Sequence, residues 1–240
     1  MKKDFLFQNS RGSSKKKDTS VTPGEIAVQV RPPRSNLKSL RVEAVSSEVI
    51  KTLIIQGHYL HSMPATTTAC FAVYQERELV GAAVFTIGSR SGYLILSAAK
   101  PQDVATLARF YLKDALPKNS ESRVLSIILR MLRNLKPWKF LLSFADPAYR
   151  HVGTIYQATG WLYLGMTGRN GYVGFGENLL FHPRSLYNHF KTNSLQYFRE
   201  HGIPASRHYF PGKHRYGYFL DPSWRWRLRY VPQPYPRKEA

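Results

Sequence analysis

The stretch DPAYRHVGTIYQATGWLYLG, residues 146–165, places an acidic residue, a short helix and an apolar strand in close succession. An apolar, strand-like run ends at Asp146, and open α/β sheets bind their ligands at such strand ends. GTIYQATG predicts a short helix that stops at Gly160, because glycine readily adopts the left-handed conformation that ends helices. WLYLGM then predicts a further strand. Tyr156 is therefore expected on a short helix beside a strand end that suits a ligand site.

The amino-acid composition is strongly basic. The 240 residues include 35 Lys and Arg against 15 Asp and Glu, a net charge of +20. Such a surplus opposes compaction by self-repulsion and attracts a polyanion, so nucleic acid is the expected partner. The alternative is a soluble protein whose basic surface has no specific partner. Hydrophobic residues make up 43% of the chain, which is enough to bury a core.

Other features disfavour several classes of protein. Cys70, inside ACFAVY, is the one cysteine, and a lone buried thiol indicates a reducing compartment without a disulfide framework. The sequence has no apolar run of the roughly 18 residues that a membrane-spanning helix needs. MKKDFLFQNS at the N-terminus lacks the apolar segment of a secretory signal. We therefore expect a cytoplasmic protein.

The first half of the chain changes from a polar segment to regular patterns. Residues 1–37 are rich in Lys, Ser, Pro and Gly and predict a disordered basic arm. Residues 46–61 predict a helix behind a serine cap. CFAVYQERELVGAAVFTI, residues 70–87, predicts a β-hairpin, and ATLARFYL, residues 105–112, predicts another strand.

SESRVLSIILRMLRNL, residues 120–135, gives the clearest helical pattern, with Ser120 as its cap and apolar residues at helical spacing. KFLLSFAD, residues 139–146, predicts the next strand. Strand–helix–strand units that follow a hairpin predict an α/β fold with a mixed central sheet.

The pattern weakens toward the C-terminus. We expect residues 38–176 to form the catalytic core and residues 177–240 to form a basic helix and hairpin extension packed on it. RHYFPGKHRYGYF, residues 207–219, predicts a hairpin that turns at Pro211-Gly212. WRWRLRY, residues 224–230, predicts a strand with aromatic rings on one face and arginines on the other.

The start of the helix at residue 120 is a candidate site for an anion. Its first backbone N–H groups lack partners and lie at the positive end of the helix dipole, so a phosphate or pyrophosphate can bind there. Lys118 and Arg123 add positive charge. The loop lacks the glycine spacing of a P-loop or a dinucleotide-binding turn, which argues against ATP and NAD. An ordinary capped helix start is an equally open interpretation.

Tyr156 and Asp146 are candidates for proton transfer. A phenol, with an ordinary pKa of about 10, can donate its proton to a leaving thiolate. For a tyrosine in such a segment, a core position with a satisfied hydroxyl is the more common role. For an aspartate ahead of a proline, a turn or helix-capping role is the more common one.

Two levels of resemblance follow from these segments. The order of elements and the segment IYQATGWLYLGM resemble the acyl-CoA N-acyltransferase (GNAT) superfamily. LPKNSESRVLS, LLSFADPAYRHVGTIYQATGWLYLGMT and GKHRYGYFL together are similar to the Mom family of phage DNA adenine-modification proteins, over roughly residues 38–236. The resemblance implies a GNAT-like mixed central sheet with a basic C-terminal hairpin extension.

The same resemblance implies a function. It implies modification of the exocyclic amine of adenine in double-stranded DNA by a carbamoylmethyl or acyl-type group, which protects phage DNA from restriction. It also implies an acyl-CoA-type donor, with acetyl-CoA expected, a suspected dependence on iron, and action in the cytoplasm of the bacterial host. The long N-terminal arm departs from the family pattern, so target choice need not follow that of other members.

Site residues follow motif by motif. His58 and Tyr59 of GHYLHS match the family's His-Tyr pair, and Asp146 and Tyr156 match residues that the family needs. Arg109 and Ser122 match donor-binding positions. With the helix start, they give the candidate donor-binding set Arg109, Lys118, Asn119, Ser120, Ser122 and Arg123.

Metal and nucleic-acid sites are also suggested. His58 and His61, three residues apart on the predicted helix, can join Asp146 in a two-His, one-carboxylate site, although a histidine with ordinary hydrogen bonds is the more common outcome. A base inside a duplex must be flipped out before it reacts, and aromatic rings interleaved with arginines suit stacking on it. An ordinary edge strand with a solvated basic face is the alternative. The candidate DNA-binding residues are Lys213, Arg215, Trp224, Arg225, Trp226 and Arg227.

Two other functions stay open. A conventional acyltransferase acting on a protein or small-molecule amine uses Tyr156 and the donor loop but leaves the basic charge unexplained. A non-catalytic nucleic-acid-binding protein on an acyltransferase scaffold explains the charge alone. DNA modification is the leading hypothesis, and it places Ser122 and the Tyr156 phenol in one cleft.

Overall fold

The computed structural model describes residues 39–87, 92–176, 179–181 and 183–237. The basic arm predicted for residues 1–37 lies outside these ranges. None of the described helices is both long enough and apolar enough to span a bilayer.

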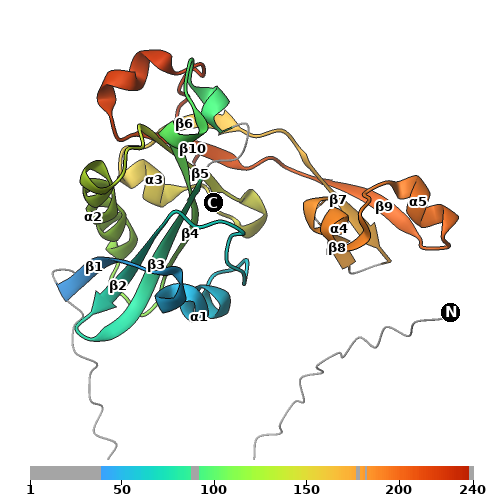
Figure 1. The fold of residues 1–240 in the computed structure, drawn as a ribbon, viewed down its shortest axis with the longest axis horizontal. Helices are drawn as coiled ribbons and strands as arrows, with labels where there is room; N and C mark the ends of the chain where they lie inside the picture. The colour runs from blue at the N-terminus through green and yellow to red at the C-terminus, as the bar shows by residue number, and fades with distance from the viewer. Residues whose placement is uncertain (1–38, 88–91, 177–178, 182, 238–240) are drawn as a thin grey trace, which may run out of the picture. The chain divides into compact units, whose positions relative to one another are not determined.

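A seven-stranded sheet forms the centre of the fold, in the order β1-β2-β3-β4-β5-β10-β6 (Figure 1). Every neighbouring pair is antiparallel except β4 and β5, which are parallel. The predicted mixed α/β sheet is thereby confirmed. The strands are β1 (Leu40–Val45), β2 (Ala69–Gln75), β3 (Glu78–Ile87), β4 (Val104–Leu112), β5 (Phe140–Ala145), β6 (Leu162–Met166) and β10 (His214–Phe219). Among these, β1 was not predicted.

Three helices accompany the sheet: α1 (Ser47–Gly57), α2 (Ser120–Leu135) and α3 (Thr154–Ala158). Alternate residues of a strand point to opposite faces, and β2 follows this rule. Phe71 packs in the core cluster that contains the apolar side of α2, whereas Cys70 packs with Ile50 and Ile54 of α1. Both faces of the sheet are therefore covered, and Cys70 is a buried free thiol, as predicted.

The parallel strands β4 and β5 separate soon after they pair. Only residues Val104–Thr106 of β4 pair with β5, where their partners are Phe140–Leu142. At the next position the Ser143 hydroxyl oxygen lies 3.1 Å from the Leu107 carbonyl oxygen, so a side chain replaces the backbone ladder. The β3–β4 register shifts between Leu107 and Arg109, and such bulges re-aim side chains near functional sites.

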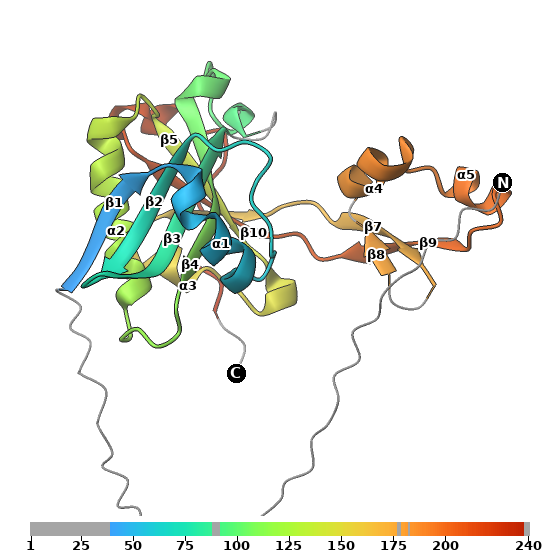
Figure 2. The same cartoon turned by 60° about the horizontal axis from the view of Figure 1, so that its bottom comes forward.

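Residues 170–210, which we term the inserted lobe, follow β6 and precede β10 along the chain and contain a second sheet (Figure 2). Its own core contains Val173, Leu186, Phe198 and Ala205. Its strand order is β8-β7-β9. The elements are β7 (Asn170–Phe175), β8 (Leu179–Phe181), α4 (Pro183–Phe190), α5 (Leu195–Glu200) and β9 (Ala205–Phe210).

The predicted C-terminal hairpin is wrong, and with it the division at residue 176. β9 pairs with β7 of the inserted lobe, whereas β10 lies between β5 and β6 of the central sheet. Tyr216 of β10 is fully buried, so this strand is part of the core and not an extension packed on it. A Pro-Gly turn signals a change of direction but does not specify which strands pair.

The predicted strand over residues 224–230 is also wrong. Pro222–Arg227 form a short 3₁₀ helix, η5. Asp221 caps it by accepting hydrogen bonds from the backbone N–H and the hydroxyl of Ser223. Pro222 occupies the first helical position, where its missing N–H costs nothing. The Asp-Pro-Ser start signal therefore outweighs the alternation of Trp and Arg.

Gly153 is required by the way α3 packs on β10. Its φ is +76°, and a Cβ there would lie 2.3 Å from the Tyr216 ring. We expect Gly153→Ala to lower the free energy of unfolding by about 3 kcal/mol, through both strain and clash. Gly160→Ala is the matched control, because its φ is +75° and no atom lies within 4 Å of its would-be Cβ. That variant isolates the strain, at about 1 kcal/mol. Equal urea midpoints for the two variants would contradict this account.

Candidate active site

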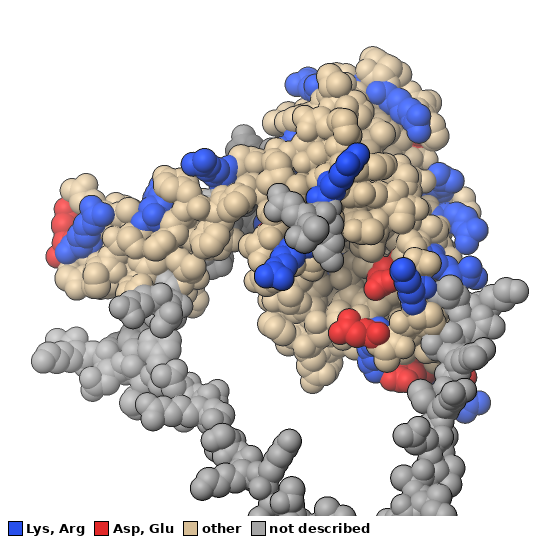
Figure 3. Space-filling model, turned by 180° about the vertical axis from the view of Figure 1, so that it is seen from behind, with Lys and Arg blue, Asp and Glu red and all other residues tan. Residues whose placement is uncertain are grey.

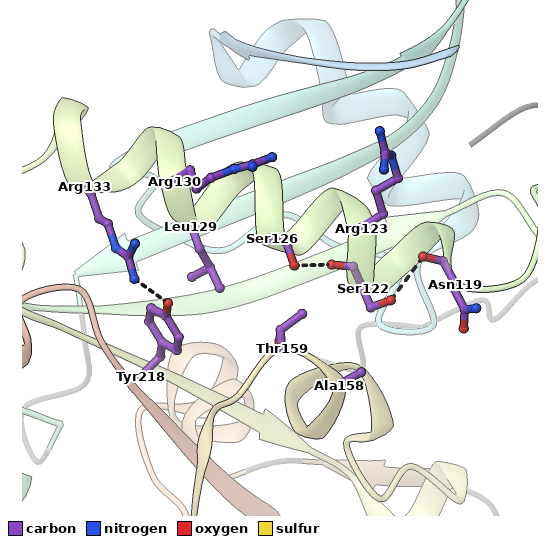
Figure 4. Close-up of a pocket in the computed structure, with 10 residues that line it drawn as sticks. All are labelled: Asn119, Ser122, Arg123, Ser126, Leu129, Arg130, Arg133, Ala158, Thr159 and Tyr218. Atoms are coloured by element: carbon purple, nitrogen blue, oxygen red, sulfur yellow. Dashed lines mark hydrogen bonds between the residues drawn. The ribbon is translucent and has the colours of Figure 1, made fainter. Parts of the chain in front are cut away.

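One side of α2 along most of its length, the end of α3 and a residue of β10 line an open groove of about 550 Å³ (Figure 4). The amides of Glu121 and Ser122 have no hydrogen-bond partner within the described part of the chain. A helix start with free amides attracts an anion. Arginines along α2 add positive charge to the same wall. The groove is lined by Asn119, Ser122, Arg123, Ser126, Leu129, Arg130, Arg133, Ala158, Thr159 and Tyr218.

The predicted donor-binding residues are only partly brought together. Asn119, Ser122 and Arg123 line the groove. Ser120 points inward and donates a hydrogen bond of 2.6 Å to the Pro117 carbonyl oxygen. Lys118 is exposed beside the helix but is not a lining residue, and Arg109 lies elsewhere.

Several lining residues were missed by the sequence analysis. Ser126, Arg130 and Arg133 continue the face of α2 that begins at Ser122, so helical periodicity was a signal that could have identified them. Arg133 donates a 2.8 Å hydrogen bond to the hydroxyl of Tyr218, a residue of β10. No local pattern predicts Tyr218, because its place depends on the position of β10 in the sheet.

A second group of side chains gathers near the ends of α1 and β5. We term it the Tyr59 cluster; it comprises His58, Tyr59, Arg109, Asp146, Tyr149, His151 and Lys213. Its members are linked by ring contacts, by an ion pair and by electrostatic interactions. The cluster includes three of the four predicted catalytic residues, together with Arg109.

The aromatic part of the cluster centres on Tyr59. The Tyr59 ring stacks on His58 with centroids 4.4 Å apart, and Tyr149 lies at the same separation. His151 meets Tyr59 edge to face at 5.5 Å. His58 is buried, whereas Tyr149 is 49% exposed and presents its ring to solvent. Arg109 is held beside them because it donates hydrogen bonds to the carbonyl oxygens of Ser62 and Ala108.

The polar part of the cluster is an ion pair between Asp146 and Lys213. Lys213 Nζ lies 2.8 Å from one carboxylate oxygen of Asp146, and the other oxygen accepts a hydrogen bond from the Ala148 amide. Burial by itself lowers the pKa of Lys213, but its hydrogen bond with Asp146 and the aspartate charge outweigh that effect and raise the pKa. Lys213 is therefore a protonated donor at neutral pH.

Tyr156 lies where β4 and β5 separate. Its hydroxyl oxygen is 2.7 Å from the Ser143 hydroxyl, and its ring packs between Trp161 and Tyr216. Burial raises the pKa of Tyr156 to about 12, although the Ser143 hydrogen bond acts in the opposite direction. The phenol is thus protonated at neutral pH and can act as a proton donor but not as a base.

The expected single cleft is not formed in this structure. Ser122 lines the groove, whereas Tyr156 is 7% exposed and is not a lining residue. Ala158 and Thr159, which follow it in the chain, do line the groove. The Tyr156 hydroxyl also interacts electrostatically with Tyr59. Tyr156 therefore lies in the wall between the groove and the Tyr59 cluster.

The residues predicted to hold iron do not fit a metal ion. α1 ends at Gly57, so His58 and His61 do not share a helix face. The Nδ1 atom of His58 accepts a hydrogen bond from the Leu60 amide, which places the proton on Nε2 and leaves no free lone pair on the ring. Asp146 is engaged by Lys213. In the described ranges no three His, Cys, Asp or Glu side chains gather as a metal site.

The predicted DNA-binding residues have structural contacts of their own. The Arg227 guanidinium lies 4.3 Å from the Trp224 ring centroid and donates hydrogen bonds to the Ser97 and Ala98 carbonyl oxygens. Arg215 stacks over Tyr230. Arg225 and Trp226 are exposed. Lys and Arg are scattered over the face in Figure 3 and do not form one continuous track there.

Comparison with known proteins places the chain in a family. The sequence model of the Mom protein family matches residues 39–237. The chain belongs to the Mom protein family. The methylcarbamoylase mom of Escherichia phage Mu is 29% identical over 243 residues, covering 96% of this chain and 97% of that protein. The family expected from the sequence motifs is confirmed.

Among solved structures, two acetyltransferases are similar to part of this chain. An IAA acetyltransferase from Bacillus cereus is 11% identical and covers 75% of this chain and 99% of its own, with a TM-score of 0.44. An aminoglycoside acetyltransferase in complex with coenzyme A is 14% identical and covers 54% of this chain and 87% of its own, with a TM-score of 0.42.

The buried His58 makes stability depend on pH. Burial, followed by the positive charges of Arg109, His151 and His61, lowers the pKa of His58 from 6.5 to about 4. As the pH falls below 6.5, the unfolded chain takes up a proton at this histidine before the folded chain does. The stabilising contribution is therefore complete above pH 6.5 and is lost as the pH falls toward 4.

We expect His58→Asn, whose amide oxygen can still accept from the Leu60 amide, to reduce the loss of unfolding free energy between pH 7 and pH 4.5. Urea denaturation at both pH values measures this difference. The exposed His201→Asn variant is the control and should behave as the wild type. An unchanged pH dependence in His58→Asn would show that His58 is not the titrating group.

Proposed function

We propose that this protein is a DNA modification transferase that alters the exocyclic amine of adenine with a carbamoylmethyl or acyl-type group. The observation that carries the proposal is membership of the Mom family over residues 39–237, supported by the phage Mu relative, which is named a methylcarbamoylase. The modification would protect phage DNA from restriction, and its place of action would be the cytoplasm of the bacterial host.

The groove at α2 supports an acyl-CoA-type donor, with acetyl-CoA expected. Phosphates suit free amides at a helix start, and guanidinium groups bind phosphate through paired hydrogen bonds. Arg123 directly follows the amides of Glu121 and Ser122, and Arg130 lies about two helical turns further along the same wall. We assign the pyrophosphate of the donor to this end of the groove.

The net charge of +20 supports double-stranded DNA as the other substrate. Positive side chains displace counterions from the phosphates, so binding should weaken steeply as salt increases. An adenine within a duplex is shielded by stacking and must be flipped out before its amine can react. The Tyr59 cluster supports an acceptor site, because it combines an exposed ring, Tyr149, with a carboxylate, Asp146.

The chemical step assigns a role to each group. For transfer of an acyl-type group, the adenine amine attacks the thioester carbonyl carbon of the donor, so a nitrogen–carbon bond forms and the carbon–sulfur bond breaks. Asp146 accepts the proton that the amine loses. Tyr156 gives its proton to the departing thiolate, a role that its protonated state at neutral pH allows. His58 and Tyr59 orient the acceptor.

Tyr156→Phe and Asp146→Ala should both abolish adenine modification while DNA affinity stays within about twofold of wild type, because neither side chain is exposed to a DNA backbone. DNA from bacteria that express each variant is digested to nucleosides and analysed by mass spectrometry, and the mass increment identifies the transferred group. Tyr209→Phe, an exposed tyrosine of the inserted lobe, is the control. Unmodified deoxyadenosine with folded wild-type protein refutes the proposed function.

Arg130→Gln should weaken binding of coenzyme A about five- to tenfold, because it removes one charge-assisted contact to phosphate. Isothermal titration calorimetry with coenzyme A measures the effect. Arg77→Gln, which removes an exposed arginine from the β2–β3 turn, is the matched control. Equal affinities in the two variants would place the donor outside this groove.

A further inference from the structure

We propose that Lys213 and Asp146 together recognise the flipped adenine by hydrogen bonding. Asp146 accepts a hydrogen bond from the exocyclic amine, and Lys213 donates one to the ring nitrogen beside that amine. This inference rests on the proposed function and names the acceptor subsite within the Tyr59 cluster. Lys213 would then position the base and contribute to base specificity, whereas the sequence analysis had assigned it to DNA binding.

The Lys213–Asp146 ion pair is less exposed to solvent than the other ion pairs in the described ranges. The Lys213 and Asp146 side chains are 29% and 12% exposed, and in every other ion pair there both partners are more exposed than this. Removing two charges from water costs free energy that their attraction often fails to offset, so an enclosed pair is a poor means of stabilising a fold. An enclosed charge whose pKa is shifted, as that of Lys213 is, is instead typical of functional sites.

The backbone holds Lys213 in place independently of its side chain. Its amide donates a 2.8 Å hydrogen bond to the Thr167 hydroxyl, and its carbonyl oxygen accepts one of 2.9 Å from the Thr167 amide. Gly212 passes so close to the Thr167 carbonyl that a Cβ would lie 1.8 Å from it. Substitution of the Lys213 side chain therefore leaves these three backbone constraints intact.

The hydrogen-bonding pattern of the pair matches adenine. A carboxylate can only accept hydrogen bonds, and an ammonium group can only donate them. Adenine presents an amine donor beside a ring-nitrogen acceptor, whereas guanine carries the acceptor O6 where adenine has its amine, so a guanine placed in the same pose would leave Asp146 without a partner. A site built to hydrogen-bond its substrate rejects analogues that leave a buried polar group unpaired.

The rings of the cluster supply the surface on which the base stacks. Tyr149 is 49% exposed, and it packs on Tyr59, which itself stacks on the buried His58. These contacts support the Tyr149 ring on the side that faces Tyr59. Cytosine shares adenine's order of donor and acceptor, so discrimination between these two bases falls to the stacking surface, which favours the larger purine.

The experiment compares full-length wild type, Lys213→Met and Lys213→Arg on three DNAs. These are plasmid-length duplexes copied with adenine, 7-deazaadenine or 1-deazaadenine, where each analogue lacks one ring nitrogen beside the amine. Lys113→Met is the matched control, since it removes a lysine from an exposed ion pair with Glu78. Modification is measured by nucleoside mass spectrometry, and DNA affinity is measured across salt concentrations.

We expect Lys213→Met to lower adenine modification at least about tenfold with DNA affinity and its salt dependence unchanged. Wild type should lose a similar factor on one of the two deaza DNAs, and Lys213→Met should lose nothing more on that DNA. The effects of removing the lysine and of removing the ring nitrogen would then not add, a result that a purely structural role of Lys213 would not produce. Lys213→Arg keeps the positive charge on a side chain of different length and shape, so its rate of adenine modification should lie between those of wild type and Lys213→Met. Lys113→Met should modify adenine as wild type does.

Two results would overturn the inference. One is a general loss of DNA affinity with a shallower salt dependence in Lys213→Met, which identifies a phosphate contact. The other is equal wild-type activity on all three DNAs, which decides the matter even if Lys213→Met fails to fold. If wild type modifies no adenine at all, the proposed function is refuted. If wild type modifies adenine and both deaza analogues equally well, only the proposed contact between Lys213 and the ring nitrogen is refuted.

Discussion

The pairing of β10 with both β5 and β6 links the two candidate sites to the central sheet. β10 supplies Tyr216, which is buried against Gly153 and the Tyr156 ring, and Tyr218, which anchors Arg133 at the groove. The residue before the strand, Lys213, reaches Asp146 at the end of β5. One strand therefore contributes to both candidate binding sites, and the inserted lobe occupies the long connection that brings it back to the sheet.

The separation of β4 and β5 gives these sites a common wall. Where the backbone ladder ends, Ser143 lies between the Leu107 carbonyl and the Tyr156 hydroxyl. A hydroxyl has one proton, so Ser143 can donate to only one of these oxygens at a time. When it donates to Leu107, it accepts from Tyr156. The same serine thus fixes the phenol and closes the gap between the strands.

Much of the local structure was predicted from the sequence. α2 was recognised from its apolar spacing, α3 from its glycine stop, and the hairpin of β2 and β3 from its two apolar runs. The predicted cap was wrong, because Ser120 is the first residue of α2 and Asn119 is its N-cap. The family motifs led to His58, Tyr59 and Asp146, which the structure gathers in one cluster. Arg109 was assigned to the donor groove but lies in that cluster, because the bulge in β4 and its bonds to Ser62 and Ala108 set its direction.

The basic charge, most central helices and strands, and the family are evident from the sequence, because charge, periodicity and motifs are properties of neighbouring residues. Three features required the folded chain: the contact of Lys213 with Asp146, the placement of β9 and β10 in different sheets, and the enclosure of Tyr156 beside Ser143. The physical reason is that strand pairing is specified by the burial of whole faces across the sheet, and a turn between two strands carries no record of their partners.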